Sequence, residues 1–285
     1  MRGDVTDAAA VHAAVRGHDA VIHLAARVSV TGPWRAFAAV NVAGTANILT
    51  AARAAGSVRR LVFVSSPSVA HSGSSLVGAG AGVADPARAR GHYARSKAAA
   101  ELLALGADGQ DLAVVAVRPH LVWGPGDTQL VGRIVARARA GRLVLVGRGL
   151  ALMDCTYVDN AAAAIAAALD RVSLAHGQAV VVTNGEPRPV AEVLARICVA
   201  AGAPAPTRRV PFAVARTGGA VVEGLWALLG RTDDPPMTRF LAEQLATAHW
   251  FDQRHTREVL DWTPTVGLEE GFARLASWYA ADPTR

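Results

Sequence analysis

Short apolar runs that suit buried strands alternate, in the first half of the chain, with alanine-rich stretches that suit helices. The strand-like runs cover residues 20–25, 60–65 and 112–117, and the helical stretches cover 36–55 and 93–105. Strands and helices that alternate in this way form a parallel sheet with helices packed on its faces. The pattern therefore predicts an α/β fold.

After residue 146 the pattern changes to more numerous helices and shorter strands. We predict a first domain of residues 1–146 and a smaller, mainly substrate-binding part of residues 147–285, with 156–170 packing back on the first sheet. Residues 71–91 are rich in Gly, Ser and Ala without a clear period, which predicts a long loop. Further helices are expected at 189–201, 212–229, 237–246, 254–261 and 268–281.

The composition argues against several classes of protein. No run approaches the roughly 20 apolar residues of a membrane span, and the first residues do not resemble a signal peptide. The two cysteines, Cys155 and Cys198, are too few for a disulfide framework and lack metal-site spacing, so we expect a cytoplasmic protein without a metal. The net charge of +6 comes from scattered arginines, which argues against nucleic acid as a partner.

The chain contains one lysine, Lys97, and it follows Tyr93 by four residues. The stretch around the pair is rich in Ala and Leu and predicts a helix on which the two side chains share a face. A nearby ammonium lowers the pKa of a tyrosine from its usual value of about 10. Such a phenol can pass a proton to a carbonyl oxygen while a hydride arrives from elsewhere. The alternative is an ordinary pair on a helix surface.

Six short segments follow one another in a set order. They are Gly3-Asp4-Val5-Thr6-Asp7, His23-Leu24-Ala25-Ala26, Asn41-Val42-Ala43-Gly44-Thr45, Val64-Ser65-Ser66, Tyr93 with Lys97, and Arg118-Pro119 with Gly124-Pro125. Together they resemble the extended short-chain dehydrogenase/reductase family over essentially the whole chain. The resemblance implies a Rossmann-like, doubly wound parallel sheet with a smaller C-terminal substrate domain. The run Ser65-Ser66-Pro67-Ser68-Val69 resembles the 3β-hydroxysteroid dehydrogenase branch of that family.

The second half narrows the resemblance. Residues 123–131, 184–187 and 235–245 are similar to a group of that branch that acts in bacterial olefin biosynthesis. The similarity implies NADPH-dependent reduction of a long-chain 2-alkyl-3-oxoalkanoate to the 3-hydroxy acid, with NAD(H) as the alternative cofactor. It also implies a hydrophobic small-molecule substrate and a homodimer or multienzyme assembly. A steroid-type hydroxyl dehydrogenase is the alternative function.

The family motifs imply roles for individual residues of this chain. Tyr93 donates the proton, Lys97 holds the ribose hydroxyls of the cofactor, and Ser66 orients the carbonyl, with Ser65 and Ser68 as alternatives to Ser66. The residues expected to bind the cofactor are Asp4, Val5, Leu24, Ala25, Ala26, Tyr93, Lys97, Pro119 and Val122.

One part of the family pattern is missing from the sequence. The family begins with a strand, a glycine-rich turn and a helix that bind the pyrophosphate through backbone N–H groups. Only two residues precede Gly3-Asp4 here, and 78–82 follow no strand-like run and open no helix. We therefore expect a sheet without its first strands, and a non-catalytic homologue is a third candidate function.

Several other residues keep two interpretations. Asn41 completes a proton relay or makes a structural hydrogen bond within its helix. His23 is expected to be a core histidine, and Cys155 a small buried residue rather than a nucleophile. The apolar stretch 211–229 is a core helix, the wall of a hydrophobic site, or a surface that contacts partner enzymes or a membrane. Contact with the substrate is an option for three histidines, His71, His92 and His120.

Overall fold

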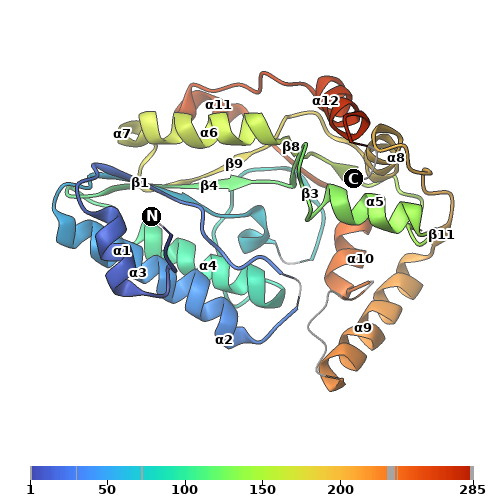
Figure 1. The fold of residues 1–285 in the computed structure, drawn as a ribbon, viewed down its shortest axis with the longest axis horizontal. Coiled ribbons are helices and arrows are strands. Elements are labelled where there is room, and N and C mark those ends of the chain that lie inside the picture. The colour runs from blue at the N-terminus through green and yellow to red at the C-terminus, as the bar shows by residue number, and fades with distance from the viewer. Residues whose placement is uncertain (1, 30, 72, 230–234, 236, 283–285) are drawn as a thin grey trace.

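A sheet of four parallel strands forms the centre of the molecule (Figure 1). Across the sheet the strands are β1 (Ala20–His23), β2 (Arg60–Val64), β4 (Ala113–Pro119) and β9 (Ala179–Val182). This computed structural model describes residues 2–29, 31–71, 73–229, 235 and 237–282. The all-parallel pairing confirms the predicted α/β fold, because parallel neighbours require helical crossovers between them.

Helices cover both faces of this sheet, as Figure 1 shows. On one face α1 (Ala8–Val15), α3 (Gly44–Ala55) and α4 (Gly91–Leu105) pack on Leu61 and Phe63 of β2. Three more helices lie on the opposite face and pack on the alternate residues of the strands, among them Val62, Val115 and Val117. These helices are α6 (Val158–Asp170), α7 (Val172–Ala175) and α11 (Arg254–Leu260). Successive side chains of a strand point to opposite faces, so β2 serves both cores.

More of the chain returns to this sheet than residues 156–170. The strand β9 and the short helix α7 belong to the same layers, and α11 comes from still further along the chain. The edges of the four-stranded sheet are β1 and β9.

The predicted helix at 36–55 forms in three pieces. A short helix α2 (Trp34–Phe37) continues into a π-helical turn, Ala38–Ala43, and then into α3. Gly56 ends α3 in the left-handed conformation, with φ of 66°, which glycine adopts without a steric penalty. π-Helical turns are rare and often occur at functional sites, and this one contains Asn41.

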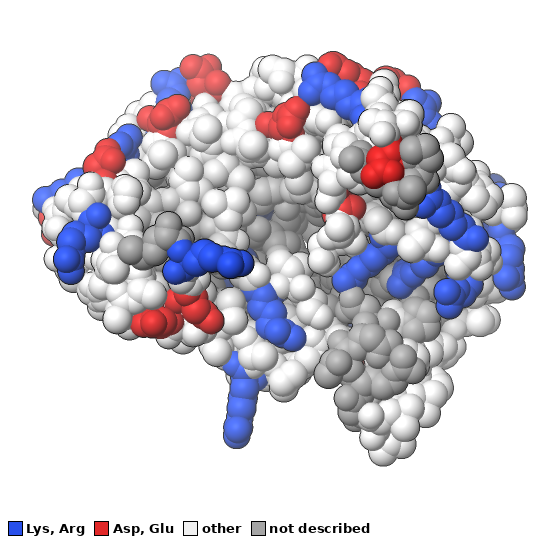
Figure 2. Space-filling model, viewed as in Figure 1, with Lys and Arg blue, Asp and Glu red and all other residues white. Residues whose placement is uncertain are grey.

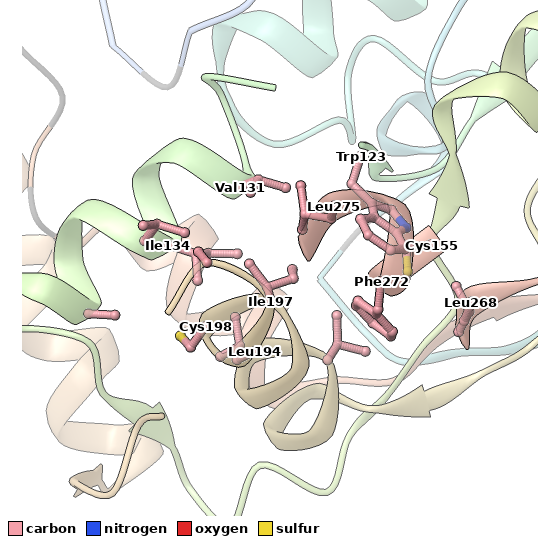
Figure 3. Packing of buried hydrophobic residues seen from close by; sticks show 14 of the residues in the cluster. Trp123, Val131, Ile134, Cys155, Leu194, Ile197, Cys198, Leu268, Phe272 and Leu275 are labelled. Atoms are coloured by element: carbon pink, nitrogen blue, oxygen red, sulfur yellow. The ribbon is translucent and has the colours of Figure 1, made fainter. Parts of the chain in front are cut away.

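A second hydrophobic core lies beyond the carboxyl end of the sheet, between α5 (Val131–Arg139), α8 (Val190–Ala200) and α12 (Leu268–Ala280). Figure 3 shows its large side chains, with the rings of Trp123 and Phe272 4.7 Å apart. Asp127 caps the start of α5, since its carboxylate accepts from the backbone N–H groups of the next turn.

Short strands connect these helices. They pair as β5 (Val122–Trp123) with β8 (Thr156–Tyr157), β6 (Leu145–Val146) with β11 (Arg209–Val210), and a sheet in the order β10 (Arg188–Pro189), β7 (Leu152–Met153), β12 (His249–Phe251) and β3 (Leu76–Ala79). The strand β3 corrects the prediction of a long loop at 71–91. Its partner is β12, in which His249 pairs with Leu76 of β3, 173 residues earlier, so no local pattern indicates the pairing.

Two further helices of the second half, α9 (Phe212–Leu228) and α10 (Arg239–Ala246), pack against each other. The helix α9 extends away from the body of the molecule in Figure 1. Val221 and Leu228 of α9 are 62% and 81% exposed, so the core-helix interpretation of 211–229 is wrong. Within the described residues, no helix combines the length and apolar character needed to cross a membrane.

Candidate active site

A cleft of about 1060 Å³ lies between α4 and the helices α9 and α10. The segment after β1 and the first turn of α4 form one wall. The residues that line the cleft are Arg27, Ser29, Thr31, Gly32, Pro33, Arg90, Gly91, His92, Tyr93, Ala94, Arg216, Glu223, Trp226, Thr238, Arg239, Phe240 and Glu243. Figure 2 shows a face of the molecule that is hollowed near its centre, with basic side chains scattered around it.

Tyr93 and Lys97 lie on the same face of α4, as their spacing predicts. The ammonium of Lys97 donates to the carbonyl oxygen of Val64 at 2.7 Å, and Tyr93 has the side chain of Ser66 as its hydrogen-bond partner. Both partners are at the carboxyl end of β2. Open α/β sheets bind their ligands at this edge, and Tyr93 also lines the cleft.

The electrostatics of Tyr93 differ from the expectation. Desolvation by burial raises the pKa of the phenol, and the hydrogen bond from Ser66 offsets part of that rise. The lowered pKa expected from Lys97 is therefore wrong. The physical reason is that Lys97 points its ammonium at the Val64 carbonyl and over the Phe63 ring, 4.1 Å from the ring centre.

Lys97 is itself nearly inaccessible to water, with 3% of its surface exposed. Burial lowers its pKa to about 8, while the carboxylate of Glu101 one turn further along the helix acts in the opposite direction. With this pKa the ammonium is still mostly protonated at neutral pH, but it loses its proton far more readily than an exposed lysine does. Two of its three N–H donors remain after the bond to Val64.

Ser66 is the serine that the structure brings to the phenol. Its hydroxyl lies 3.0 Å from that of Ser68 and accepts from the Ser68 backbone N–H at 3.3 Å. Ser65 is buried, and among the described residues its hydroxyl has no hydrogen-bond partner. The neighbourhood of Tyr93 thus distinguishes the three serines, which the sequence alone does not.

Asn41 connects the two sides of the site. Its amide nitrogen donates to Ser96 of α4 at 2.8 Å and to the backbone oxygen of Arg27 at 3.2 Å, while its oxygen accepts from the Arg27 N–H at 2.7 Å. Ser96 in turn donates to the backbone oxygen of Tyr93 at 2.8 Å. These bonds join separate elements, so the expectation of a bond within its own helix is wrong. Asn41 fixes the segment after β1 against the Tyr93 helix.

The residues expected to bind a nicotinamide cofactor gather at this same edge of the sheet. Leu24 and Ala25 follow β1 and are exposed, with Leu24 58% exposed. Pro119 ends β4, and Val122 begins β5 with 37% of its surface exposed. Leu121 between them has a φ of 45°, an unusual value for a bulky residue that is often found at functional sites. Exposed apolar side chains beside small ones at strand ends fit a planar ring and its ribose.

Asp4 and Val5 lie at the start of the described chain. Asp4 is exposed, and its carboxylate accepts from the backbone N–H and the hydroxyl of Thr6, both at 2.9 Å, which lowers its pKa. Val5 packs against Gly44, where an added Cβ would come within 2.8 Å of the valine side chain. Gly44 of the Asn-Val-Ala-Gly-Thr segment therefore permits a close approach of two backbones.

A buried ion pair anchors α4 to the sheet, and no sequence motif indicated it. The guanidinium of Arg118 on β4 binds Glu101 through two parallel hydrogen bonds, with Nε 2.9 Å from the carboxylate. Each side chain is 1% exposed. Arg118 also donates to the backbone oxygens of Ala81 and Gly82. The pair satisfies both charges and sets the position of the helix one turn from Lys97.

Arginines in the cleft were also missed by sequence reasoning. The carboxylate of Glu243 accepts from Arg90 at 2.6 Å and lies 3.4 Å from Arg216, which links α4, α9 and α10 across the cleft. Arg239 pairs with Glu223 at 2.8 Å. Four arginines against two glutamates line the cleft, so its net charge favours an anionic ligand.

The histidines divide into two groups. His92 lines the cleft and lies 3.0 Å from the Gly32 oxygen. His71 and His120 are buried instead in a stack with His249, whose ring lies 4.8 Å from that of His71. His23 is a buried core histidine as expected, with Nε2 3.0 Å from the hydroxyl of Thr45.

Cys155 is buried, as expected, and burial raises the pKa of its thiol to about 12. A thiol in this state is not a nucleophile at neutral pH.

Comparison with known proteins agrees with this geometry. The family described as 3-beta hydroxysteroid dehydrogenase/isomerase matches residues 1–210. The chain belongs to this family. It is accordingly an oxidoreductase of an NAD(P)-dependent family whose relatives act on hydroxyl or keto groups, which confirms the predicted class of enzyme.

Two relatives match this chain over most of their own length. The 2-alkyl-3-oxoalkanoate reductase of Stenotrophomonas maltophilia is 43% identical over 99% of this chain and 86% of the relative. The protein of the same description from Shewanella oneidensis is 38% identical over 96% of this chain and 74% of the relative. A 3beta-hydroxysteroid-dehydrogenase/decarboxylase of Arabidopsis thaliana is 32% identical over 96% of this chain and 50% of its own length.

Solved structures share the fold. An epimerase of Methanothermobacter thermautotrophicus superposes with a TM-score of 0.75 at 21% identity, covering all of this chain and 79% of the other. The dTDP-glucose 4,6-dehydratase of Streptomyces venezuelae, solved with NAD and TYD bound, gives 0.74 at 24% identity, over 99% and 79% of the two chains. The Rossmann-like fold predicted from the sequence is thus confirmed.

Proposed function

We propose that this protein reduces a long-chain 2-alkyl-3-oxoalkanoate to the 2-alkyl-3-hydroxyalkanoate with NADPH. The observation that carries the proposal is the position of Tyr93, which shares a face of α4 with Lys97, neighbours Ser66, and lines a cleft with an excess of arginines. The identity of 43% to a 2-alkyl-3-oxoalkanoate reductase supports this substrate class.

The residues of the chain supply position, a proton and charge. A nicotinamide cofactor bound at this edge of the sheet would supply the hydride for the reduction. Ser66 donates a hydrogen bond to the carbonyl oxygen and holds it beside the phenol. Tyr93 gives that oxygen its proton as negative charge develops there, so the ketone becomes a secondary alcohol. Lys97, with two free donors, holds the ribose hydroxyls and stabilises the phenolate that remains.

The arginine-rich cleft accounts for the acid group of the substrate. The carboxylate of a 3-oxo acid is two carbons from the ketone, so it enters the cleft together with the reacting carbonyl. Arg27 is placed for this role, because it lines the cleft and its backbone is fixed by Asn41. A cationic cleft attracts an anionic substrate and raises its local concentration.

The test is an assay of NADPH oxidation with a freshly hydrolysed 2-alkyl-3-oxo acid, run beside NADH and beside a 3β-hydroxysteroid with NAD. We expect turnover of the oxo acid, with NADPH preferred. Turnover of the steroid alone would identify a hydroxysteroid dehydrogenase. Absence of NADPH binding in a direct titration of the purified chain would identify a non-catalytic homologue.

A further inference from the structure

A second cavity lies behind the cleft, and the mechanism above does not use it. This inner pocket has a volume of about 190 Å³ and is enclosed by α5, α8 and α10, with Trp123, Met153 and Cys155 between them. Its lining is Trp123, Gln129, Leu130, Arg133, Ile134, Arg137, Leu143, Met153, Cys155, Val193, Leu194, Ile197, Pro235, Thr238, Phe240, Leu241 and Leu245. Figure 3 shows Ile134, Leu194 and Ile197 of this lining within the second hydrophobic core.

The inner pocket and the cleft share a wall. Thr238 and Phe240, at the start of α10, line both cavities. Tyr93 lines the cleft on the other side. The start of α10 therefore lies between the two cavities.

The lining of the inner pocket is chemically suited to hydrocarbon. Two of the helices, α8 and α10, contribute aliphatic side chains at spacings of three and four residues, such as Leu241 and Leu245 of α10. The third, α5, contributes Ile134 together with Arg133 and Arg137. The Gln129 side chain at its margin is bonded to Arg133 at 3.1 Å. The indole N–H of Trp123 lies beside the sulfur of Cys155 and has no oxygen acceptor among the described residues (Figure 3). Apart from Gln129, Arg133, Arg137 and Thr238, the lining offers a polar ligand little to replace its bonds to water.

The size of the inner pocket exceeds an ordinary packing defect. Voids larger than one water are few in protein interiors, and a dry apolar cavity of about 150 Å³ takes a molecule the size of benzene. At roughly 30 Å³ for each water-sized unit, 190 Å³ accommodates a chain of about six carbon atoms.

We propose that the inner pocket binds one of the two alkyl chains of the substrate, while the carboxylate and the ketone stay in the cleft. This inference rests on the proposed function for the identity of the acid. It adds that the start of α10, with Thr238 and Phe240, separates the polar end of the substrate from one hydrocarbon chain. The protein thereby selects a branched acid over a small ketone.

Isothermal titration calorimetry on the purified full chain tests the proposal without cofactor or turnover. The ligands are stable 2-alkyl-3-hydroxyalkanoates with two chains that are lengthened in steps from one to eight carbons. Each buried methylene is worth about 0.8 kcal/mol, or about fourfold in Kd, so Kd falls about fourfold per methylene until the pocket is full. An affinity that is independent of chain length overturns the proposal.

Two variants locate the binding to the inner pocket. Leu241→Trp on α10 and Val193→Phe on α8 fill the cavity from two different helices. If one of the two variants does not fold, the other still tests the proposal. Exclusion of about three methylenes weakens the two-chain ligand on the order of fifty-fold. Gln244→Trp, on the same helix as Leu241 but outside the lining, keeps Kd within twofold. Equal affinities for all four proteins overturn the proposal.

The outcome is separate from that of the proposed reaction. A wild-type assay with NADPH and a small ketone, ethyl 2-methylacetoacetate, reports the reductase chemistry alone. If affinity depends on alkyl-chain length but no ketone is reduced, the hydrocarbon site is supported and the proposed reductase activity is contradicted. If the ketone is reduced but affinity does not depend on alkyl-chain length, the reductase activity is supported and the hydrocarbon site is contradicted.

Discussion

Two regions of the molecule are built on different principles: the wall of the cleft formed by α4, and the wall of the inner pocket formed by α5, α8 and α10. The wall formed by α4 rests on the sheet through small side chains, with Ala94, Ala98, Ala100 and Ala104 all at most 2% exposed. The wall formed by α5, α8 and α10 is made of long aliphatic side chains and encloses a cavity of about 190 Å³. One wall is close-packed and polar where it meets the cleft, and the other is hollow and apolar.

This difference matches the roles proposed for the two walls. Proton transfer needs groups held within a few tenths of an ångström, and small residues let a helix lie close enough to a sheet for Lys97 to reach a strand carbonyl. Binding of a flexible hydrocarbon needs space without polar groups. Protein interiors pack at crystal-like density. A wall whose side chains are held rigid by close packing therefore leaves no cavity for a ligand.

The largest expected effect tests the chemistry of the polar wall. We expect Tyr93→Phe to lower kcat by about 10² to 10⁴, the usual contribution of general acid–base catalysis. The melting temperature should change little, because the phenol lines a cleft rather than a core. The measurement is NADPH oxidation with the two-chain oxo acid, with Tyr279→Phe on α12 as the matched control. Near-normal turnover of Tyr93→Phe would contradict its role.

The next effect tests whether the polar wall depends on its buried ion pair. Arg118→Leu leaves Glu101 as an unpaired buried carboxylate, which should cost about 3–5 kcal/mol in the free energy of unfolding. Denaturant titration measures it. The double variant with Glu101→Leu should recover much of the loss. Arg59→Leu, which breaks an exposed pair with Asp111, should cost at most about 1 kcal/mol. Equal costs at the two sites would contradict the distinction.

A change of pH acts on three buried histidines. Burial lowers the pKa of His23 and His120 to about 4 and that of His249 to about 3. The unfolded chain binds protons on these rings first, from about pH 6.5 downward, so stability present above that pH is lost as it falls toward 4. Asp154 acts in the opposite direction, since burial raises its pKa to about 6 and the folded state then takes up a proton earlier.

The histidines outnumber the aspartate, so the net effect is a loss. Between pH 7 and pH 5 each of the three histidines contributes about 2 kcal/mol and Asp154 returns about 1 kcal/mol, which leaves roughly 5 kcal/mol at most. Denaturant titrations at pH 7, 6 and 5 measure the slope. His249→Gln should flatten it, and His18→Gln, at an exposed position, should not. A slope unchanged by His249→Gln would show that this ring does not titrate on unfolding.

The smallest effect probes the packed part of the apolar wall. A Cβ on Gly271 of α12 would lie 2.9 Å from the ring of Tyr157 and 3.0 Å from that of Trp123. Gly271→Ala should therefore destabilise the fold by about 1–3 kcal/mol. Gly218→Ala on α9, where nothing lies within 4 Å, should stabilise it by up to about 1 kcal/mol. Thermal melting compares the two, and a neutral Gly271→Ala would mean that the hollow extends to α12.

The periodic segments of the first half could be predicted from sequence. The three strand-like runs and the helix at Tyr93 form close to where the pattern placed them, because a strand buried on both faces is apolar throughout and alanine favours helix. The order of the motifs also indicated the family. The strand β3 could not be predicted, since its four residues gain their structure from β12 far along the chain.

The features of the site also fall into those that the sequence predicts and those that depend on the tertiary structure. The sequence alone determined that Tyr93 and Lys97 share a helical face, because that follows from a spacing of four residues. Only the tertiary structure decided where the charges go: it placed the Lys97 ammonium on a strand carbonyl, brought Ser66 to the phenol, and buried Arg118 against Glu101. Electrostatic surroundings depend on groups that meet through the fold rather than along the chain, and so does a cavity between three helices.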